Sequence, residues 1–187
     1  MVNFVEDLPT LWKVVTRLEQ AAIPYMLTGS LALNFYGHIR ATNDMDIVIQ
    51  VTPSDAVRIY QLFAKDFYII QETVQEAIAR GGMFNVIDNE TIFKVDFIMA
   101  RQDPFSRRQF ERRRRIQVGE QTVPVIAPED LILAKLEWSR ESRSEMQEED
   151  IRNILRVSGG EFDKNYLETA AREIGMSARL QQIYETI

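Results

Sequence analysis

The sequence contains no cysteine and only one histidine, His38. A chain without cysteine has no disulfide framework, no thiolate zinc site and no cysteine nucleophile. A single imidazole also excludes a metal centre built from several histidines. Any bound metal must therefore be held mainly by oxygen ligands, which favours hard cations such as Mg²⁺ or Mn²⁺.

Long apolar runs are also missing, and no stretch reaches the length that spans a membrane. The first residues, MVNFVEDLPTLWKVV, carry acids where a signal peptide would have positive charge. Hydrophobic residues make up 45% and charged residues 27% of the 187 residues, which is the balance of a globular domain. We therefore expect a cytoplasmic protein that has no membrane partner.

Positive charge is scarce overall, because 28 acidic residues outnumber 22 lysines and arginines and leave a net charge of −6. This excess argues against a protein that coats nucleic acid with its whole surface. Positive charge is nevertheless concentrated in the basic segment, residues 101–115, which holds seven arginines: Arg101, Arg107, Arg108, Arg112, Arg113, Arg114 and Arg115. The segment is a candidate contact for RNA, and a solvated charged face is the alternative.

The apolar spacing predicts an α+β fold, with a mixed β-sheet core flanked by helices over residues 1–127 and a C-terminal helical region over 128–187. In the core we expect strands at 25–27, 45–51, 67–70, 83–87, 91–99, 115–118 and 122–126, and helices at 8–22, 31–36, 54–65 and 72–80. The aromatic and methionine side chains fall at core periods, and we interpret them as packing: Trp12, Phe35, Phe63, Met99 and Trp138.

The strongest functional signal is Gly29-Ser30, followed after thirteen residues by Asp44-Met45-Asp46 at the start of a predicted strand. Side chains two apart in a strand share a face and lie about 6.5 Å apart at the backbone. Two carboxylates at this spacing can converge on metal ions that hold a triphosphate. A glycine lets phosphate approach the backbone closely, and Ser30 adds a donor at a helix N-terminus.

These residues resemble the signature of the nucleotidyltransferase superfamily, in which a strand, Gly-Ser and a short helix precede an Asp-x-Asp pair on the next strand. The string TGSLALNFYGHIRATNDMDIVI is similar to the branch that includes AbiEii-type toxins of toxin–antitoxin systems. The tail, with Pro128-Glu129-Asp130-Leu131, Lys135 and Asp150, is similar to the helical region of that branch. The resemblance implies that Lys135 contacts the nucleotide phosphates and that Asp150 supports the site.

The superfamily also has a third carboxylate on a later strand, and Asp96 in KVDFIM matches it. The resemblance implies that Asp96 is a metal ligand, or the base for an acceptor hydroxyl, beside Asp44 and Asp46. Arg40 is a candidate phosphate contact, with pairing to Asp44 as the alternative. Lys135 and Asp150 also have plain interpretations, as a lysine lying along an apolar helix face and an ordinary surface acid.

We therefore predict a Mg²⁺- or Mn²⁺-dependent enzyme that transfers a nucleoside monophosphate from a nucleoside triphosphate to an acceptor. The resemblance suggests the 3′ end of tRNA as the acceptor, contacted through the basic segment, and a cognate antitoxin as a protein partner. Nucleotidylation of a protein, or of a small molecule such as an antibiotic, is the second hypothesis. A binding protein that kept the fold and lost turnover is the third.

Overall fold

A computed structural model describes residues 9–36, 42–142, 145–157 and 162–187. Its centre is one seven-stranded mixed sheet with the order β3-β4-β5-β2-β1-β7-β6. The strands are β1 (Tyr25–Thr28), β2 (Asp44–Ile49), β3 (Phe67–Tyr68), β4 (Met83–Asp88), β5 (Lys94–Met99), β6 (Arg114–Val118) and β7 (Gln121–Val125). This mixed sheet with flanking helices confirms the fold class predicted from the sequence.

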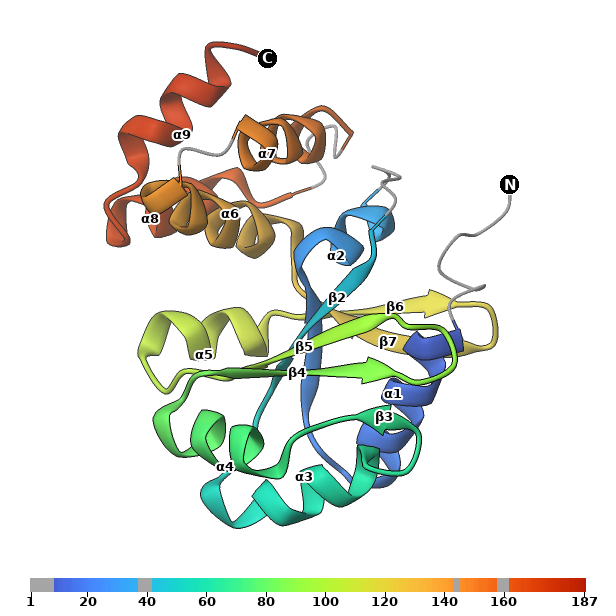
Figure 1. The fold of residues 1–187 in the computed structure, drawn as a ribbon. Helices are drawn as coiled ribbons and strands as arrows, with labels where there is room; N and C mark the ends of the chain where they lie inside the picture. Colours follow the sequence, from blue (N-terminus) through green and yellow to red (C-terminus); the bar gives the residue numbers. More distant parts are fainter. Residues whose placement is uncertain (1–8, 37–41, 143–144, 158–161) are drawn as a thin grey trace.

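Helices cover the sheet and extend it at one end. Those of the N-terminal part are α1 (Pro9–Gln20), α2 (Gly29–Phe35), α3 (Ala56–Phe63), α4 (Gln71–Arg80) and α5 (Pro104–Glu111), with a 3₁₀ turn at Pro53–Asp55. They are followed by α6 (Pro128–Ser142), α7 (Glu145–Val157), α8 (Lys164–Glu173) and α9 (Ser177–Tyr184). Helices α6 to α9 gather on the side of the molecule where α2 lies, whereas α3 and α4 lie on the opposite side (Figure 1).

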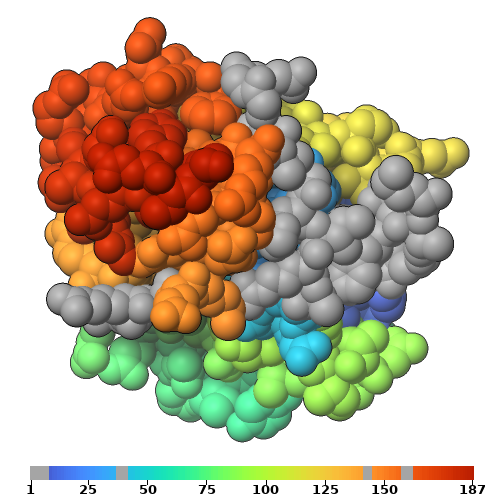
Figure 2. Space-filling model, turned by 90° about the horizontal axis from the view of Figure 1, so that it is seen from above, coloured from blue at the N-terminus to red at the C-terminus, as the bar shows by residue number. Residues whose placement is uncertain are grey.

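Seen from above, the C-terminal helices, coloured orange to red, form one side of this face, and the β6–β7 hairpin, in yellow, forms the other (Figure 2). The Tyr36 hydroxyl donates to the Ile126 carbonyl at 2.5 Å and so ties the end of α2 to the chain just before α6. The predicted division of the chain at Pro128 stays a prediction. None of the helices in the described part of the chain combines the length and apolar character that a bilayer crossing requires.

Strand β2 organises the centre of the sheet. It pairs antiparallel with β1 and parallel with β5, so that Asp46 lies opposite Thr28 on one side and opposite Asp96 on the other. Its side chains alternate between half-buried and buried, with Met45, Ile47 and Ile49 in the core. The alternation fixes the register, because a slip of one residue would turn the acids into the core.

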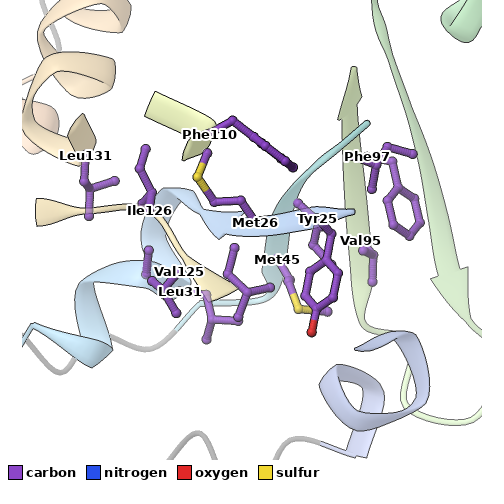
Figure 3. Packing of buried hydrophobic residues seen from close by; sticks show 14 of the residues in the cluster. Tyr25, Met26, Leu31, Met45, Val95, Phe97, Phe110, Val125, Ile126 and Leu131 are labelled. Carbon is purple, nitrogen blue, oxygen red and sulfur yellow. The ribbon is translucent and has the colours of Figure 1, made fainter. Parts of the chain in front are cut away.

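Apolar side chains from both halves of the chain share one core. Figure 3 shows Met26 of β1, Phe110 of α5, and Ile126 and Leu131 at the start of the helical region around the same strands. On the other side of the sheet, Phe97 packs against Phe63 and Phe84, with ring centroids 5.1 Å apart in both pairs. Burial of such side chains is the main stabilising contribution in a domain of this size.

One helix was not predicted, and one interpretation of a side chain as packing is wrong. The sequence predicts no element between 99 and 115, yet residues Pro104–Glu111 form α5. This short helix has few apolar residues, and its clearest signal is local: Pro104 stands at the first helical position, and the Asp103 carboxylate accepts from Ser106 N at 2.9 Å. Trp138, interpreted as core packing, is 66% exposed, because it lies on a face of α6 that points to solvent.

Candidate active site

The start of α2 and the carboxylate of Asp46 are in direct contact. Gly29 has φ +64°, a conformation that favours glycine, and a Cβ built on it would lie 1.8 Å from Asp46 Oδ2. Glycine is therefore required here for two independent reasons, the backbone conformation and the space taken by the carboxylate. Ser30 follows at the helix N-terminus, and both residues are partly exposed, so a ligand can reach them.

Three carboxylates meet where β2 and β5 run side by side. The parallel register aligns Asp46 with Asp96 and Asp44 with Lys94. Asp44 is the accessible member of the cluster, since 45% of its side chain is exposed, whereas the Asp96 side chain is 8% exposed. The Thr42 hydroxyl donates to Asp44 Oδ1 at 2.7 Å, which fixes that carboxylate from the preceding loop.

One lysine contacts this acidic cluster. Lys94 Nζ donates to Asp96 Oδ2 at 2.7 Å and lies 3.9 Å from Asp44 Oδ2. The hydrogen bond to Asp96 raises the pKa of Lys94, so its ammonium stays charged. The other oxygen, Asp96 Oδ1, is buried and has no hydrogen-bond partner among the described residues. A buried carboxylate oxygen without a donor is costly and indicates a place prepared for a cation or a hydroxyl.

Asp46 is the acid whose protonation the site alters most. Burial, reinforced by the negative charges of Asp44 and Asp96, raises the pKa of Asp46 to about 6. The positive charges of Lys94 and Lys135 act in the opposite direction but do not cancel this effect. A cation placed among the three acids would favour the ionised form of Asp46 and lower its pKa again.

The helical region contributes a buried ion pair close to these acids. Lys135 Nζ of α6 donates to Asp150 Oδ2 of α7 at 2.8 Å and to Gln147 Oε1 at 2.9 Å, and both Lys135 and Asp150 are almost fully buried. The structure thus brings together the two tail residues that the sequence singled out, and the charge of Lys135 acts on Asp46. Arg40, the other candidate phosphate contact, lies outside the described residues, as does His38.

The donor set fits a hard divalent cation. It consists of carboxylate oxygens from Asp44, Asp46 and Asp96, and one of these oxygens is buried without a partner in the described part of the chain. As they stand, however, no three carboxylate or imidazole side chains in the described ranges are arranged to hold an ion. In this arrangement the Lys94 ammonium occupies Asp96 Oδ2, an oxygen that an ion could use.

Four of the seven arginines of the basic segment contact other residues in the described part of this protein. Arg112 contacts both Glu129 and Asp130 at the start of α6, at 3.2 Å each, and its guanidinium lies 3.6 Å from the centre of the Tyr166 ring. Arg114 contacts Glu129 at 3.1 Å. Both acids are fully buried, so these two arginines serve as their counter-charges.

Other arginines of the segment also have internal contacts. Arg108 pairs with Glu173 of α8, and Arg113 donates to the Phe110 carbonyl and lies over the Phe110 ring. These contacts reduce the positive charge that residues 101–115 can offer to RNA, and the RNA contact stays a prediction. Arg101, Arg107 and Arg115 are exposed and are not among the arginines paired above, and Arg114 is exposed as well although it contacts Glu129.

The sequence analysis gave no role to three charged residues that determine the charge contacts at these sites. They are Lys94 at the acidic cluster, and Glu129 and Asp130 at the start of α6. Lys94 stands two residues before Asp96, so strand alternation alone places it on the same face, and this signal was available. Glu129 and Asp130 belong to the tail string that resembles the family branch, but neither was given a role, and their own local signal is that of acids in the first turn of a helix. Their burial depends on α5 and α8, which lie far from them in the sequence.

Comparisons with known proteins identify the fold. No protein-family model matches the sequence, and no curated protein does. A solved structure of an antigenic nucleotidyltransferase-like protein from Paracoccidioides brasiliensis is 18% identical with a TM-score of 0.57, over 94% of this chain and 91% of that one. The lincomycin-bound lincosamide antibiotic adenylyltransferase LnuA is 13% identical with a TM-score of 0.53, over 79% and 95% of the two chains. The antibiotic-resistance factor ANT(2″)-Ia is 12% identical with a TM-score of 0.52, over 95% and 96%. The chain therefore has a nucleotidyltransferase-like fold.

Proposed function

We propose that this protein is a metal-dependent nucleotidyltransferase, which moves a nucleoside monophosphate from a nucleoside triphosphate to an acceptor. One observation carries the proposal. The Asp46 carboxylate lies so close to the Gly29 backbone that a Cβ there would meet it at 1.8 Å, while β2 aligns Asp46 with the buried Asp96. A phosphate turn and a pair of acids are thus held in one place by the rigid centre of the sheet.

Each residue would have a definite part in the reaction. The amides at Gly29 and Ser30, at the start of α2, would hold the phosphate oxygens, and Lys135 would add positive charge from the helical region. Asp44 and Asp46 would hold Mg²⁺ or Mn²⁺, and Asp96 would join them as a ligand or accept a proton. Asp150 would orient Lys135 through the 2.8 Å ion pair. Arg40 stays a proposed phosphate contact.

The chemistry is an in-line displacement at the α-phosphorus. The acceptor oxygen forms a bond to that phosphorus as the bond to the bridging oxygen breaks, and pyrophosphate leaves. The proton of the acceptor hydroxyl passes to the Asp96 carboxylate. A divalent cation held by Asp44 and Asp46 would neutralise the charge that develops on the phosphates. The residues of this chain then act mainly through positioning and charge, as is usual for phosphoryl transfer.

The test is label transfer. The protein is incubated with each α-labelled nucleoside triphosphate, Mg²⁺, and separate pools of tRNA, protein and hydroxyl-bearing antibiotics. We expect label on one pool, and we expect the Asp46→Asn variant to lose transfer while keeping the parent's circular dichroism spectrum. Glu120→Gln, which changes an exposed carboxylate in the β6–β7 turn, is the matched control and should transfer like the parent. Transfer by Asp46→Asn at the parent's rate would refute the proposal.

RNA is the first candidate acceptor, with the 3′ end of tRNA and a toxin role suggested by the AbiEii-type resemblance. The buried Lys135–Asp150 pair supports that branch, because it joins the two tail residues that the resemblance marked. The exposed arginines Arg101, Arg107 and Arg115 supply positive charge for an RNA backbone. A cognate antitoxin is the partner that this role would imply.

A small hydroxyl-bearing compound is the second candidate acceptor. Two structures of similar fold are an antibiotic adenylyltransferase with bound lincomycin and an antibiotic-resistance factor. The internal pairing of Arg108, Arg112 and Arg114 also supports a small acceptor, since it reduces the positive charge available to a polyanion. Label on the antibiotic pool, with none on tRNA, would decide for this candidate.

A further inference from the structure

We propose that Lys94 is an internal counter-cation, which holds the acidic cluster of Asp44, Asp46 and Asp96 until a divalent cation and a triphosphate bind together. This inference rests on the proposed function, because it assigns the cluster to a metal. It gives Lys94 a positioning role: the lysine weakens binding of the metal alone and couples it to nucleotide binding.

The geometry places the ammonium where it opposes a metal ion. Lys94 Nζ donates to Asp96 Oδ2 at 2.7 Å and lies 3.9 Å from Asp44 Oδ2, so it already bridges two of the three acids. Strand pairing enforces this position, since Lys94 lies opposite Asp44 in the parallel register and two residues before Asp96 on the same strand. The position of Lys94 on β5 therefore brings its ammonium into contact with the cluster.

The charges explain why Lys94 must move. One ammonium cannot balance three carboxylates, so the cluster still attracts cations. An ion that takes Asp96 Oδ2 would displace the hydrogen bond and bring a second positive charge beside the first, and the two would repel. The lysine is able to leave, because 40% of its side chain is exposed, whereas that of Asp96 is 8% exposed.

The displaced ammonium needs a new anionic partner. The triphosphate supplies one, because the proposed phosphate turn at Gly29 lies directly against Asp46. With metal alone, the ammonium would lose its hydrogen bond to Asp96 and keep only the longer contact with Asp44, whereas the triphosphate would offer it new anionic oxygens. The two ligands should therefore bind cooperatively, and most of that cooperativity should depend on the positive charge at position 94.

The experiment measures Mn²⁺ binding to the metal-free protein by electron paramagnetic resonance, with and without a non-hydrolysable triphosphate analogue. Release of Asp96 from a charge-assisted hydrogen bond corresponds to roughly a tenfold or larger gain in Mn²⁺ affinity. We expect Lys94→Met to bind Mn²⁺ alone at least about tenfold more tightly than the parent. We expect the analogue to tighten Mn²⁺ binding less in this variant than in the parent.

Two controls separate charge from general disturbance. Lys94→Arg keeps the positive charge and should bind Mn²⁺ as weakly as the parent. Lys13→Met removes a lysine from a different acidic pair, where Lys13 Nζ contacts Asp88 at 3.1 Å and Glu90 at 2.6 Å, and should leave Mn²⁺ affinity unchanged. If Lys94→Met does not fold by circular dichroism, Lys94→Gln removes the charge with a polar side chain and gives the same comparison.

The outcomes distinguish this inference from the proposed function. Unchanged or weaker Mn²⁺ binding by Lys94→Met or Lys94→Gln, with metal binding intact in the parent, overturns the inference alone. Mn²⁺ binding that is equal in the parent and in Asp46→Asn, with the analogue present, overturns the assignment of the metal to this cluster and the inference with it. Tighter binding in the charge-removing variants, with both controls at the parent's affinity, supports the inference.

Discussion

Two clusters of acidic residues in this molecule lie in contrasting environments. At the junction of α5, α6 and α8, Glu129 and Asp130 are completely buried, and each carboxylate oxygen accepts a hydrogen bond. At the centre of the sheet, Asp44, Asp46 and Asp96 crowd together with one lysine in contact and with one buried oxygen that has no hydrogen-bond partner in the described part of the chain.

The difference separates structural acids from acids prepared for chemistry. The donors at the junction are Arg112, Arg114, the Tyr166 hydroxyl and the backbone amide of Asp163, all supplied by this chain. Because these carboxylates are fully hydrogen-bonded within the protein, they are not available to bind a ligand. Their contacts hold the helical region against the sheet. The acids at β2 remain able to bind a cation. Their mutual repulsion lowers the stability of the protein, and a bound cation would offset that loss.

The largest effect should come from breaking the junction. Arg112→Ala removes the contacts to Glu129 and Asp130 and leaves two buried carboxylates short of a counter-charge. We expect the free energy of unfolding to fall by about 3 kcal/mol, as is typical when one partner of a buried pair is removed. Urea denaturation measures it. The matched control is Arg107→Ala on the exposed face of α5, and equal decreases in the two variants would contradict the structural role.

Gly29→Ala should break the active cluster instead. The new Cβ would lie 1.8 Å from Asp46 Oδ2 and would force the carboxylate out of place, so we expect nucleotidyl transfer to fall by about a hundredfold or more. Gly81→Ala is the matched control. Gly81 has the same φ of +64°, but a Cβ there would have nothing within 4 Å, so this variant tests the backbone strain without a clash.

The left-handed backbone conformation should cost each glycine variant about 1 to 2 kcal/mol of stability, and Gly29→Ala should lose more than Gly81→Ala because its Cβ also meets the Asp46 carboxylate. Steady-state label transfer should then separate them, with Gly81→Ala close to the parent. If both variants transfer label equally well, the contact between Gly29 and Asp46 is not part of the active site.

A change in stability of opposite sign should follow Asp46→Asn in the metal-free protein. Folding raises the pKa of Asp46 from 3.8 to about 6, so the folded state holds its proton more tightly than the unfolded state. The stability from this group is complete below pH 4 and is lost as the pH rises through about 6.

Asparagine does not ionise, so the variant should escape this loss. We expect it to exceed the parent's free energy of unfolding by about 3 kcal/mol at pH 7.5 in the presence of a chelator, with the difference vanishing near pH 4. Denaturation curves across that pH range give the measurement. A constant difference between the two proteins at every pH would contradict the pKa assigned to Asp46.

The smallest change in stability is expected from the exposed arginines. Replacing Arg101, Arg107 and Arg115 together by alanine should alter the free energy of unfolding by about 0.5 kcal/mol or less per site. If RNA is the acceptor, the triple variant should bind it more weakly, and the salt dependence should become shallower by about one unit for each RNA phosphate that the protein no longer neutralises. Unchanged RNA transfer at several salt concentrations would favour a small acceptor.

Much of the fold could be predicted from the sequence where the signal was local and repetitive. Alternation in residues 45–51 predicted a strand that begins with two acids on one face, and the structure has this strand at Asp44–Ile49. Helix α5 escaped prediction because only Phe105 and Phe110 give it apolar spacing, and the turn between β4 and β5 extends to Phe93, with Ile92 at φ +58°. These elements are stabilised by contacts with distant parts of the chain rather than by their own periodicity.

The sequence by itself determined the chemistry that is available. It excluded thiolate and multi-histidine centres, and it placed Gly29-Ser30 before Asp44 and Asp46, because glycine conformation and strand alternation act over a few residues. Only the tertiary structure decided which charges meet. The parallel pairing of β2 with β5 sets Asp96 and Lys94 beside residues fifty positions earlier, and the docking of α6 on α5 turns Arg112 from a candidate RNA contact into the partner of buried acids. Electrostatic interactions depend on distance and burial in space, and neither can be read from separation along the chain.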